Sequence, residues 1–417
     1  MKKKLIIGLI GLGTVGAGVV KSLKPFENVE IKTVAVRNLN KKRDVEVKEL
    51  TDDPTKIVND PEINVVVEVA GGVNPAFDLL KTAIQNGKHI VTANKELLAK
   101  HGAELFDLAN KHNVAILYEA AVAGGIPIIL PIKTTLRGNK FSKVAGILNG
   151  TTNYILTKME ENNISYQECL KDAQELGYAE ADPTGDVEGF DTMYKIATLA
   201  NIVFHKRIDI KKIHREGITK ISADDIKYAN ELGYKIKLIA LAQDIDGQID
   251  LRVHPMLVKK DNVISGINNA LNAVMLEGHP VGQVMFTGPG AGEFPTASSV
   301  VGDILAIEAE FGKCEDILPM TRCHHKEQAI QKDVLDTQNS YYINITAKNA
   351  IGTIGTIGTV CGKNKINLSS ILQKGTKQDG TAQIIVITET CSERDIQNAI
   401  KELNEHSITI NNLIRVM

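Results

Sequence analysis

Residues 8–16 read Gly-Leu-Ile-Gly-Leu-Gly-Thr-Val-Gly and follow directly on the apolar residues 5–7. Gly11, Gly13 and Gly16 form a Gly-x-Gly-x-x-Gly pattern at the point where a strand would turn into a helix. In such a turn the first glycine permits the bend, the second lets the backbone approach a pyrophosphate, and the third lets the helix pack on the strand. The stretch therefore predicts a dinucleotide-binding unit.

The residues that follow support this prediction. Thr14 and Val15 begin an amphipathic stretch, and the free N–H groups at the start of such a helix are expected to face the cofactor phosphates. Residues 29–36 alternate as a second strand, whose end normally carries an acid for the ribose 2′-hydroxyl. Arg37 stands there instead, with more cations at residues 41–43. The cluster favours NADP over NAD, and the alternative is an ordinary solvated charge run.

The composition limits the class of protein. The 417 residues are 43% apolar, which is enough for two or three domains with sizeable cores. A net charge of −2 and the absence of tryptophan give no sign of a nucleic-acid or anionic-membrane partner. Five scattered cysteines without a C-x-x-C pair favour a reducing, cytoplasmic location. Residues 1–20 resemble a secretory signal, but glycines interrupt them at phosphate-loop spacing, so we expect a buried first strand.

Residues 1–125 predict a Rossmann-type, doubly wound α/β domain. Further short, β-branched strands are expected at residues 65–69, 90–92 and 114–118, with helices at 75–86 and 96–113. The loops after these strands should face the ligand. A glycine-rich run at residues 288–292 precedes another expected helix at 298–311.

Residues 126–285 change character and predict an α+β substrate and dimerisation domain. The expected helices are 166–176, 193–201 and 224–232, and the expected strands are 144–148, 237–242 and 249–254. Residues 313–338 are polar and irregular and are interpreted as a linker. The Cys-His-His run at 323–325 could indicate a metal site, although it matches no zinc spacing and suits an exposed linker better.

Residues 339–417 predict a βαββαβ unit, the split βαβ sandwich. The expected elements are strands at 341–346, 368–373, 382–388 and 408–416 and helices at 354–364 and 393–405. A unit of this size has a small core, so pairing with a second copy is expected.

The densest polar cluster spans residues 177–195. Pro183 and Gly185 predict a turn, and a helix is expected from about Val187. On it Asp191 and Lys195 lie four apart, on one face. An ordinary surface ion pair would give the same spacing, but the apolar residues that follow indicate that the pair is partly covered.

Together these motifs resemble the long bacterial homoserine dehydrogenases, over essentially the whole chain. The matching stretches are residues 11–16, 91–95, 119–128, 149–154, 177–195 and 288–292. The resemblance implies interconversion of L-homoserine and L-aspartate 4-semialdehyde with NAD(P), on the route to threonine and methionine. It also implies a homodimer or homotetramer.

The resemblance assigns roles residue by residue. Lys195 and Lys95 match the two active-site lysines, with Asp191 beside the reacting hydroxyl. Glu180 matches the contact to the substrate ammonium, with Asp186 near it, and Thr151 the contact to the carboxylate. Gly292 matches a cofactor contact, which implies that residues 286–312 return to the nucleotide domain. A sodium or potassium site is matched, largely through carbonyl groups, by Glu119, Val122, Gly124 and Ile126.

The chemistry agrees with these roles. Carboxylates are natural partners for the ammonium group of an amino-acid substrate. Oxidising its hydroxyl group requires loss of the hydroxyl proton, and two lysines beside a nicotinamide cation in a dry cleft favour a neutral amine on one of them. We therefore expect Lys195 or Lys95 to accept that proton and Asp191 to orient Lys195. The sequence leaves open which lysine is the base.

The terminal unit resembles an ACT domain, which in this family is commonly linked to feedback by L-threonine. Its ligand loop often begins with an acid, whereas residues 349–352 read Asn-Ala-Ile-Gly. Dimerisation through edge strands is an equal alternative, because a shared fold does not fix a function.

Two rival functions remain. An aspartate-semialdehyde dehydrogenase would need a nucleophilic cysteine, and Cys169, on a helix expected to be surface-exposed, does not lie in such a motif. A non-catalytic nucleotide-binding sensor would not need Lys95, Glu180, Asp191 and Lys195.

Overall fold

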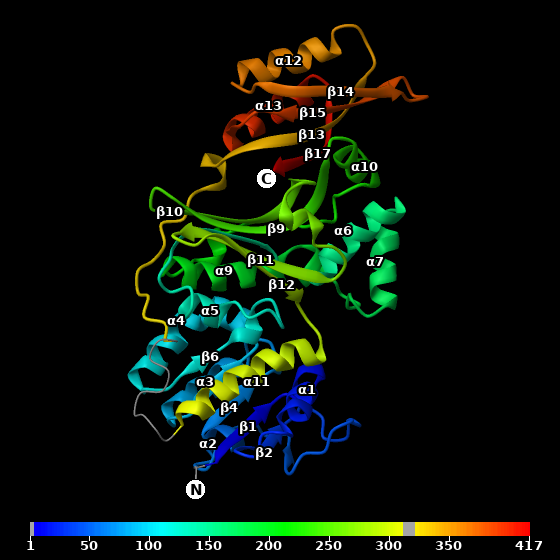
Figure 1. Cartoon of the computed structure of the whole chain (residues 1–417). Coiled ribbons are helices and arrows are strands. Elements are labelled where there is room, and N and C mark those ends of the chain that lie inside the picture. Colours follow the sequence, from blue (N-terminus) through cyan, green and yellow to red (C-terminus); the bar gives the residue numbers. More distant parts are fainter. Residues whose placement is uncertain (1–3, 312–321) are drawn as a thin grey trace. The chain divides into compact units, whose positions relative to one another are not determined.

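The computed structural model describes residues 4–311 and 322–417 (Figure 1). The chain divides into two compact units. Unit 1 comprises residues 1–150, 191–211 and 271–329, and unit 2 comprises residues 151–190, 212–270 and 330–417. Among the described residues no helix combines the length and the apolar character needed to cross a membrane.

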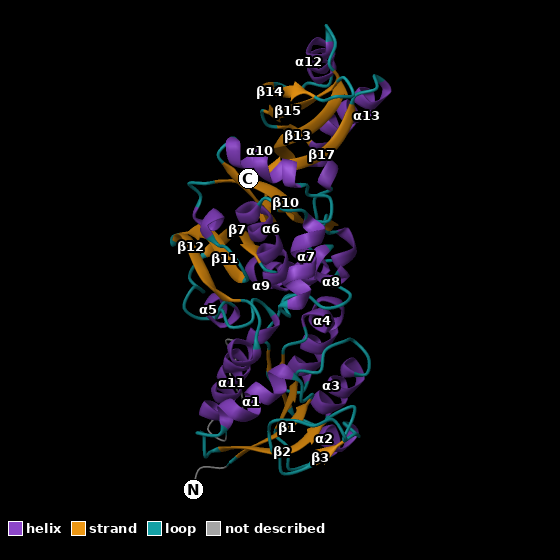
Figure 2. Ribbon diagram, turned by 90° about the vertical axis from the view of Figure 1, so that its right-hand side faces the viewer, coloured by secondary structure: helices purple, strands orange, loops and turns teal. Residues whose placement is uncertain are grey.

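A six-stranded parallel sheet forms the nucleotide-binding part of unit 1, in the order β3-β2-β1-β4-β5-β6. Its strands are β1 (Leu5–Ile10), β2 (Val29–Ala35), β3 (Leu50–Thr51), β4 (Val65–Glu68), β5 (His89–Thr92) and β6 (Ile116–Leu117). Its helices are α1 (Thr14–Leu23), α2 (Thr55–Asn59), α3 (Ala76–Gln85) and α4 (Lys95–Lys111). Figure 2 shows α1 on one side of this sheet and α2 and α3 on the other. Burial on both faces explains the unbroken apolar strands, and the predicted Rossmann-type domain is confirmed.

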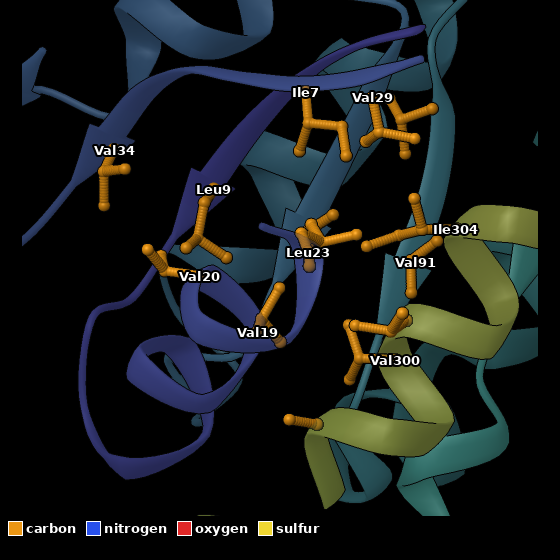
Figure 3. Close-up of a cluster of buried hydrophobic side chains, with 14 of the residues drawn as sticks. Ile7, Leu9, Val19, Val20, Leu23, Val29, Val34, Val91, Val300 and Ile304 are labelled. Carbon is orange, nitrogen blue, oxygen red and sulfur yellow. The ribbon is translucent and has the colours of Figure 1, made fainter. Parts of the chain in front are cut away.

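Helix α11 (Glu293–Glu310), far along the chain, packs in the same core. Its Val300 and Ile304 lie among the side chains of β1 and α1, including Leu9 and Leu23 (Figure 3). Close approach is possible because Gly18 of α1 faces α11: an added Cβ would lie 2.7 Å from the Glu293 carbonyl oxygen. This packing supports grouping residues 286–312 with residues 1–125.

The rest of unit 1 carries three neighbouring antiparallel strands and two helices. The strands run in the order β12 (Gly282–Pro289), β11 (Leu271–His279) and β7 (Lys140–Ile147). The helices are α5 (Ile129–Lys133) and α9 (Phe190–Phe204), whose first residue falls in unit 2. The sequence prediction missed β11 and β12 and shortened β7.

Unit 2 contains a mixed sheet in the order β9-β10-β17-β13-β15-β14. The strands are β9 (Tyr234–Ile245), β10 (Gln248–Lys259), β13 (Gln338–Lys348), β14 (Leu368–Thr376), β15 (Thr381–Thr388) and β17 (Thr409–Val416). Short strands β8 (His214–Arg215) and β16 (Cys391–Ser392) pair with β10 and β13. The helices are α6 (Gly150–Asn162), α7 (Tyr166–Glu175), α8 (Thr184–Val187), α10 (Ala223–Glu231), α12 (Thr353–Lys363) and α13 (Glu393–Glu405).

The C-terminal part of unit 2 has the predicted βαββαβ order. Helices α12 and α13 bury Ile357, Val360, Ile396 and Leu403 in one core with the strands. On the other side of these strands, Asp225 of α10 accepts hydrogen bonds from Tyr342, Asn344 and Asn412. The predicted ACT-like fold is confirmed.

Two local predictions were wrong, and one helix begins later than expected. The helix expected from about Val187, which carries Asp191 and Lys195, begins at Phe190 as α9. Residues Thr184–Val187 form a separate turn, α8, and Gly189 adopts a φ of +80° between the two. Cys169 is buried rather than exposed, on the apolar face of α7. Cys323 is also buried, at 5% exposure, although its segment was expected to be an exposed linker.

Candidate active site

Asp191 binds both of the lysines expected at the active site. Its Oδ2 lies 2.7 Å from Nζ of Lys195 and its Oδ1 lies 2.8 Å from Nζ of Lys95. The Asn149 amide donates to Oδ2 at 2.9 Å, and Lys195 also donates to the Leu148 carbonyl at 2.7 Å. All five residues belong to unit 1, so residues far apart in sequence form one compact polar site.

The local structure explains how these side chains meet. Lys95 is the first residue of α4, and the Asn94 side chain caps this helix by accepting from the Leu97 N–H. Asp191 and Lys195 lie one turn apart on α9, which is otherwise apolar and buried. Lys195 therefore lies between Asp191 and Leu148, the residue that directly follows β7. The Lys95 side chain, by contrast, is 40% exposed.

The charges of the site are unbalanced. Burial opposes ionisation of Asp191, but the Lys195 and Lys95 ammonium groups outweigh it and hold the pKa of that carboxyl well below its usual range. Asp191 is therefore a carboxylate across the physiological pH range. This single carboxylate therefore lies between the two lysine side chains.

A second group of polar residues, at the carboxyl ends of β4 and β5, was not predicted from the sequence. Glu68, at the end of β4, is fully buried and accepts from the N–H groups of Ala70 and Gly71 and from the Thr92 hydroxyl. The Asn94 amide donates to the Gly72 carbonyl at 2.6 Å. These bonds fix the loops after β4 and β5, where a doubly wound sheet binds its ligand. The sequence signal that could have revealed this group is Glu68, an acidic residue at the end of an otherwise apolar strand.

The glycine turn has the shape that a dinucleotide requires. Gly11 has a φ of +103°, and a Cβ on Gly16 would lie 2.2 Å from the Gly11 carbonyl oxygen. A Cβ on Gly13 would meet nothing within 4 Å, so the second glycine leaves open space beside the start of α1. Gly292, with a φ of +125°, precedes α11. Thr14 and Val15 form the first turn of α1, as expected.

The loop after β2 contains no acid at the predicted ribose position. Arg37 is exposed, and Arg43 braces the loop by donating to the carbonyls of Lys41 and Asn38 at 2.7 Å. These cations have the chemistry to bind a 2′-phosphate.

The residues expected to bind the substrate amino acid lie in unit 2. The Thr151 hydroxyl donates to the Tyr178 carbonyl at 2.7 Å, which ties the start of α6 to the segment that carries Glu180. Glu180 is exposed, and Asp186 lies on α8.

The segment expected to hold a monovalent cation is buried and rich in backbone hydrogen bonds. The Glu119 carboxylate accepts from the N–H groups of Ile128, Ile129 and Leu130 at 2.5–2.7 Å, and its own N–H donates to Asp303. Burial raises the pKa of Glu119, and burial together with the Glu119 charge raises that of Asp303 well above its usual range. Val122 and Ile126 are buried, and the Gly124 carbonyl accepts from the Ser299 hydroxyl.

Cys323 does not form part of a metal cluster in the described part of the chain, where no three His, Cys, Asp or Glu side chains are placed to hold a metal. Its Sγ lies 3.0 Å from Nζ of Lys133 and 3.1 Å from the Tyr118 hydroxyl. Burial opposes the thiolate, but Lys133 and His325 outweigh it and lower the pKa of Cys323 to about 6.

Comparison with protein families gives consistent matches along the chain. Residues 127–305 match the homoserine dehydrogenase family, residues 11–119 match the NAD-binding domain of homoserine dehydrogenase, and residues 341–407 match the ACT domain.

Individual relatives agree. Homoserine dehydrogenase from Synechocystis is 42% identical over 96% of both chains, and that from Bacillus subtilis is 38% identical over 97% of this chain and 95% of its own. The solved homoserine dehydrogenase of Thiobacillus denitrificans superposes with a TM-score of 0.94 at 36% identity, covering 100% of this chain and 98% of its own. A hyperthermophilic archaeal relative, solved in complex with NADPH, matches 74% of this chain and 98% of its own, at 26% identity and a TM-score of 0.64.

Proposed function

The chain belongs to the homoserine dehydrogenase family, the NAD(P)-dependent oxidoreductases (EC 1.1.1.3) that interconvert L-homoserine and L-aspartate 4-semialdehyde, and we propose that Lys95, Asp191 and Lys195 carry the proton transfer of this reaction. The observation that supports this assignment is Asp191, whose two oxygens each bind one of the lysines.

The proposed mechanism follows from the charge of this group. When bound, the nicotinamide ring accepts the hydride that leaves the carbinol carbon of homoserine. The hydroxyl proton passes to the lysine that is neutral. Asp191 stays ionised and keeps the other lysine protonated, so the net charge of the three side chains changes from zero to plus one during oxidation. Glu180 and Asp186 are proposed to bind the substrate ammonium, and Thr151 the carboxylate.

Two lysine variants test the mechanism. Lys95→Met and Lys195→Met should each lower kcat by about 10²–10⁴-fold, the usual contribution of a positioned acid or base. The variant that lacks the base should also lose the low-pH limb of the kcat profile. Lys111→Met, in the exposed last turn of α4, is the control. Cofactor affinity, measured by calorimetry in each variant, separates lost binding from lost chemistry. Turnover like the wild type in both variants would refute the assignment.

We further propose that the preferred cofactor is NADP. The support is Arg37 and the cations of residues 41–43 at the end of β2. The test compares KM for NADP and NAD in the wild type and in Arg37→Asp. The substitution should raise KM for NADP at least tenfold and leave KM for NAD almost unchanged, whereas an equal effect on both would contradict the preference.

A sodium or potassium ion is proposed to bind at Glu119, Val122, Gly124 and Ile126. Two buried carboxyl groups, those of Glu119 and Asp303, interact here, and each has a raised pKa, so a monovalent cation nearby would favour their ionised forms. Replacing the sodium and potassium of the buffer by tetramethylammonium should lower the melting temperature and kcat. Adding back potassium or sodium should restore both values. No change on removal would contradict the site.

The ACT-like part of unit 2, residues 339–417, is proposed to bind L-threonine. Asn349, which stands in place of the usual acid, accepts from the Gln373 amide at 3.2 Å. Truncation is an unsuitable test, since β17 pairs with β10 and its removal would expose that strand. Asn349→Asp should instead tighten threonine binding in calorimetry by restoring a partner for the ammonium group. Absence of any threonine effect on the wild-type enzyme would favour a purely structural role.

The proposed assembly is a homodimer or homotetramer in the cytoplasm. Strand β14 forms an end of the unit 2 sheet and carries Ile371, which is 36% exposed, so it offers an edge to a second copy. The four described cysteines are all unpaired, which suits a reducing compartment. Light scattering of the wild type and of Ile371→Lys should show the loss of the larger species in the variant.

A further inference from the structure

Unit 1 contains a cavity of about 680 Å³ that the proposed reaction does not use. It lies where α5, the end of α9 and residues 322–327 meet, and all of its lining residues belong to unit 1. None of them is a proposed catalytic, cofactor-binding or cation-binding residue. Its volume falls within the range typical of small-molecule sites.

The polar lining is almost entirely basic. The permanently charged side chains are Lys133, Arg137, Lys206, Arg322 and Lys326. Three histidines, His205, His324 and His325, also line the cavity, and Glu327 is the only acid among its described lining residues. Among the described lining residues, and with the Cys323 thiolate beside Lys133 included, the formal positive charges exceed the negative ones by three before any histidine is protonated.

Part of this charge has no acidic partner among the residues that the structure describes. Arg137, Lys206 and Lys326 form no ion pair with any described acidic side chain, whereas Arg207 beside the cavity is paired with Asp107. The contrast shows that a neighbouring cation is neutralised by the fold, whereas Arg137, Lys206 and Lys326 have no such partner among the described residues.

His205 reports a positive field inside the cavity. Its ring lies 6.0 Å from that of His325, centroid to centroid. Burial, and then the charges of His325 and Lys133, lower the pKa of His205. The cation cluster therefore acts on a group within the cavity and does not simply project into solvent.

The walls strengthen this field. Ile132, Leu136, Phe141 and Phe204 line the cavity between the charged groups. Low-dielectric walls around charges of one sign focus the potential and raise the local concentration of counter-ions. Guanidinium groups such as those of Arg137 and Arg322 match phosphate and carboxylate oxygens in a bidentate way.

We propose that this cavity binds a small polyanion that carries phosphate or carboxylate groups. The ligand would meet lysines and arginines at its charged groups and the apolar side chains at its body. Such a site is separate from the nucleotide turn at residues 11–16 and from the Asp191 group, so its occupation is a binding event additional to catalysis.

Calorimetry on the full-length enzyme saturated with NADP tests the proposal, because the dinucleotide site is then filled. Pyrophosphate and citrate serve as probes in low-salt buffer and distinguish a phosphate ligand from a polycarboxylate ligand. The double variant Arg137→Glu, Lys206→Glu should weaken the tighter probe at least tenfold. Lys56→Glu, an exposed lysine of α2, is the matched control and should bind like the wild type. Failure of both probes to bind at millimolar concentration, or equal binding by all variants, would overturn the proposal.

Histidine NMR supplies an independent readout. An anion in the cavity should raise the pKa of His205, because it offsets the charges of His325 and Lys133, while exposed His279 on β11 should not respond. Binding without a response of His205 would place the anion elsewhere and refute the site. Light scattering completes the test: if the charge reversal changes the oligomeric state, the cavity is a contact between copies and the proposal is wrong.

Discussion

At the level of single residues, the position of Asp191 shows how this fold handles charge. A carboxylate with almost no exposure is normally costly unless it is paired. Here the two lysines and the Asn149 amide satisfy it. The same carboxylate decides how many protons the two lysines hold together. A substitution that removes the Asp191 side chain would therefore disturb both its structural and its chemical role. An isosteric substitution keeps the shape of the side chain and so tests the chemical role alone.

The isosteric change Asp191→Asn makes this distinction. An amide cannot hold an ammonium group by charge, so we expect kcat to fall by about 10²–10⁴-fold. The lost compensation should also make the lysines harder to protonate and shift the low-pH limb of the kcat profile to lower pH. Asp172→Asn, on the exposed face of α7, is the control. An unshifted pH profile would show that Asp191 serves only in packing.

Alanine substitutions at two glycines of the nucleotide turn should affect different properties of the protein, stability in one case and cofactor binding alone in the other. Gly16→Ala places a Cβ 2.2 Å from the Gly11 carbonyl oxygen, so it should lower the melting temperature as well as cofactor binding. Gly13→Ala meets no protein atom within 4 Å, so the fold should be kept while KM for the cofactor rises at least tenfold. Thermal unfolding and cofactor titration of both variants check this pattern. Equal melting temperatures would contradict the role given to Gly16.

At the level of elements, a buried ion cluster holds the terminal strands to the rest of unit 2. Arg415 of β17 is 2% exposed and pairs with Glu393 of α13 and with Glu216, which follows β8. Burial opposes ionisation of Glu393, but Arg415 outweighs it, so the pKa of Glu393 is lowered. The cluster thus joins the ACT-like strands to the β8–β10 region through charge as well as through the β10–β17 pairing.

Arg415→Met should destabilise unit 2 by about 3–5 kcal/mol, because it leaves buried carboxylates without their partner. Arg394→Met, next to Glu393 on the same helix, is the control. Arg394 pairs with Asp336 where both side chains are 56% exposed, and such surface pairs contribute little. Urea unfolding of both variants measures the difference. Similar midpoints would show that the buried cluster does not hold the strands.

At the level of the whole molecule, buried neutral histidines link stability to pH. Burial, and then Arg322, lower the pKa of His89 to about 4, and its Nδ1 accepts from the Ala115 N–H. The unfolded chain binds a proton at this position below about pH 6.5, whereas the folded protein does not until about pH 4. The unfolded state therefore holds more protons in this window, and stability falls as the pH falls through it.

For His89 the loss should reach on the order of 3 kcal/mol by pH 4, from a shift of about two to three pKa units. Chemical unfolding between pH 7 and pH 4 measures it. His89→Asn keeps an acceptor for Ala115 and should flatten part of the decline, while His406→Asn, at an exposed position, should not. An unchanged slope in His89→Asn would assign the decline to other groups.

Much of the fold could be predicted because its signals are local. The glycine turn, the β-branched strands of the parallel sheet and the βαββαβ order each follow from neighbouring residues, and the structure confirms them. The resemblance named the site residues, but the spacing of Asp191 and Lys195 alone also suited an ordinary surface pair. Strands β11 and β12 escaped prediction: β12 is half-buried or exposed along its length, so its apolar pattern is weak, and β11 pairs with the distant strand β7 as well as with β12.

The sequence by itself determined the nucleotide turn, since the positive φ of Gly11 and the close approach of Gly16 to the Gly11 carbonyl involve residues within a few positions of one another. Only the tertiary structure decided that Lys95 and Lys195, one hundred residues apart, share the carboxylate of Asp191. It also decided that Cys323 is a buried group beside Lys133 and that basic residues from three segments line one cavity. Proton transfer and anion binding depend on distances of a few ångströms, and folding sets these distances between parts of the chain whose local patterns are independent.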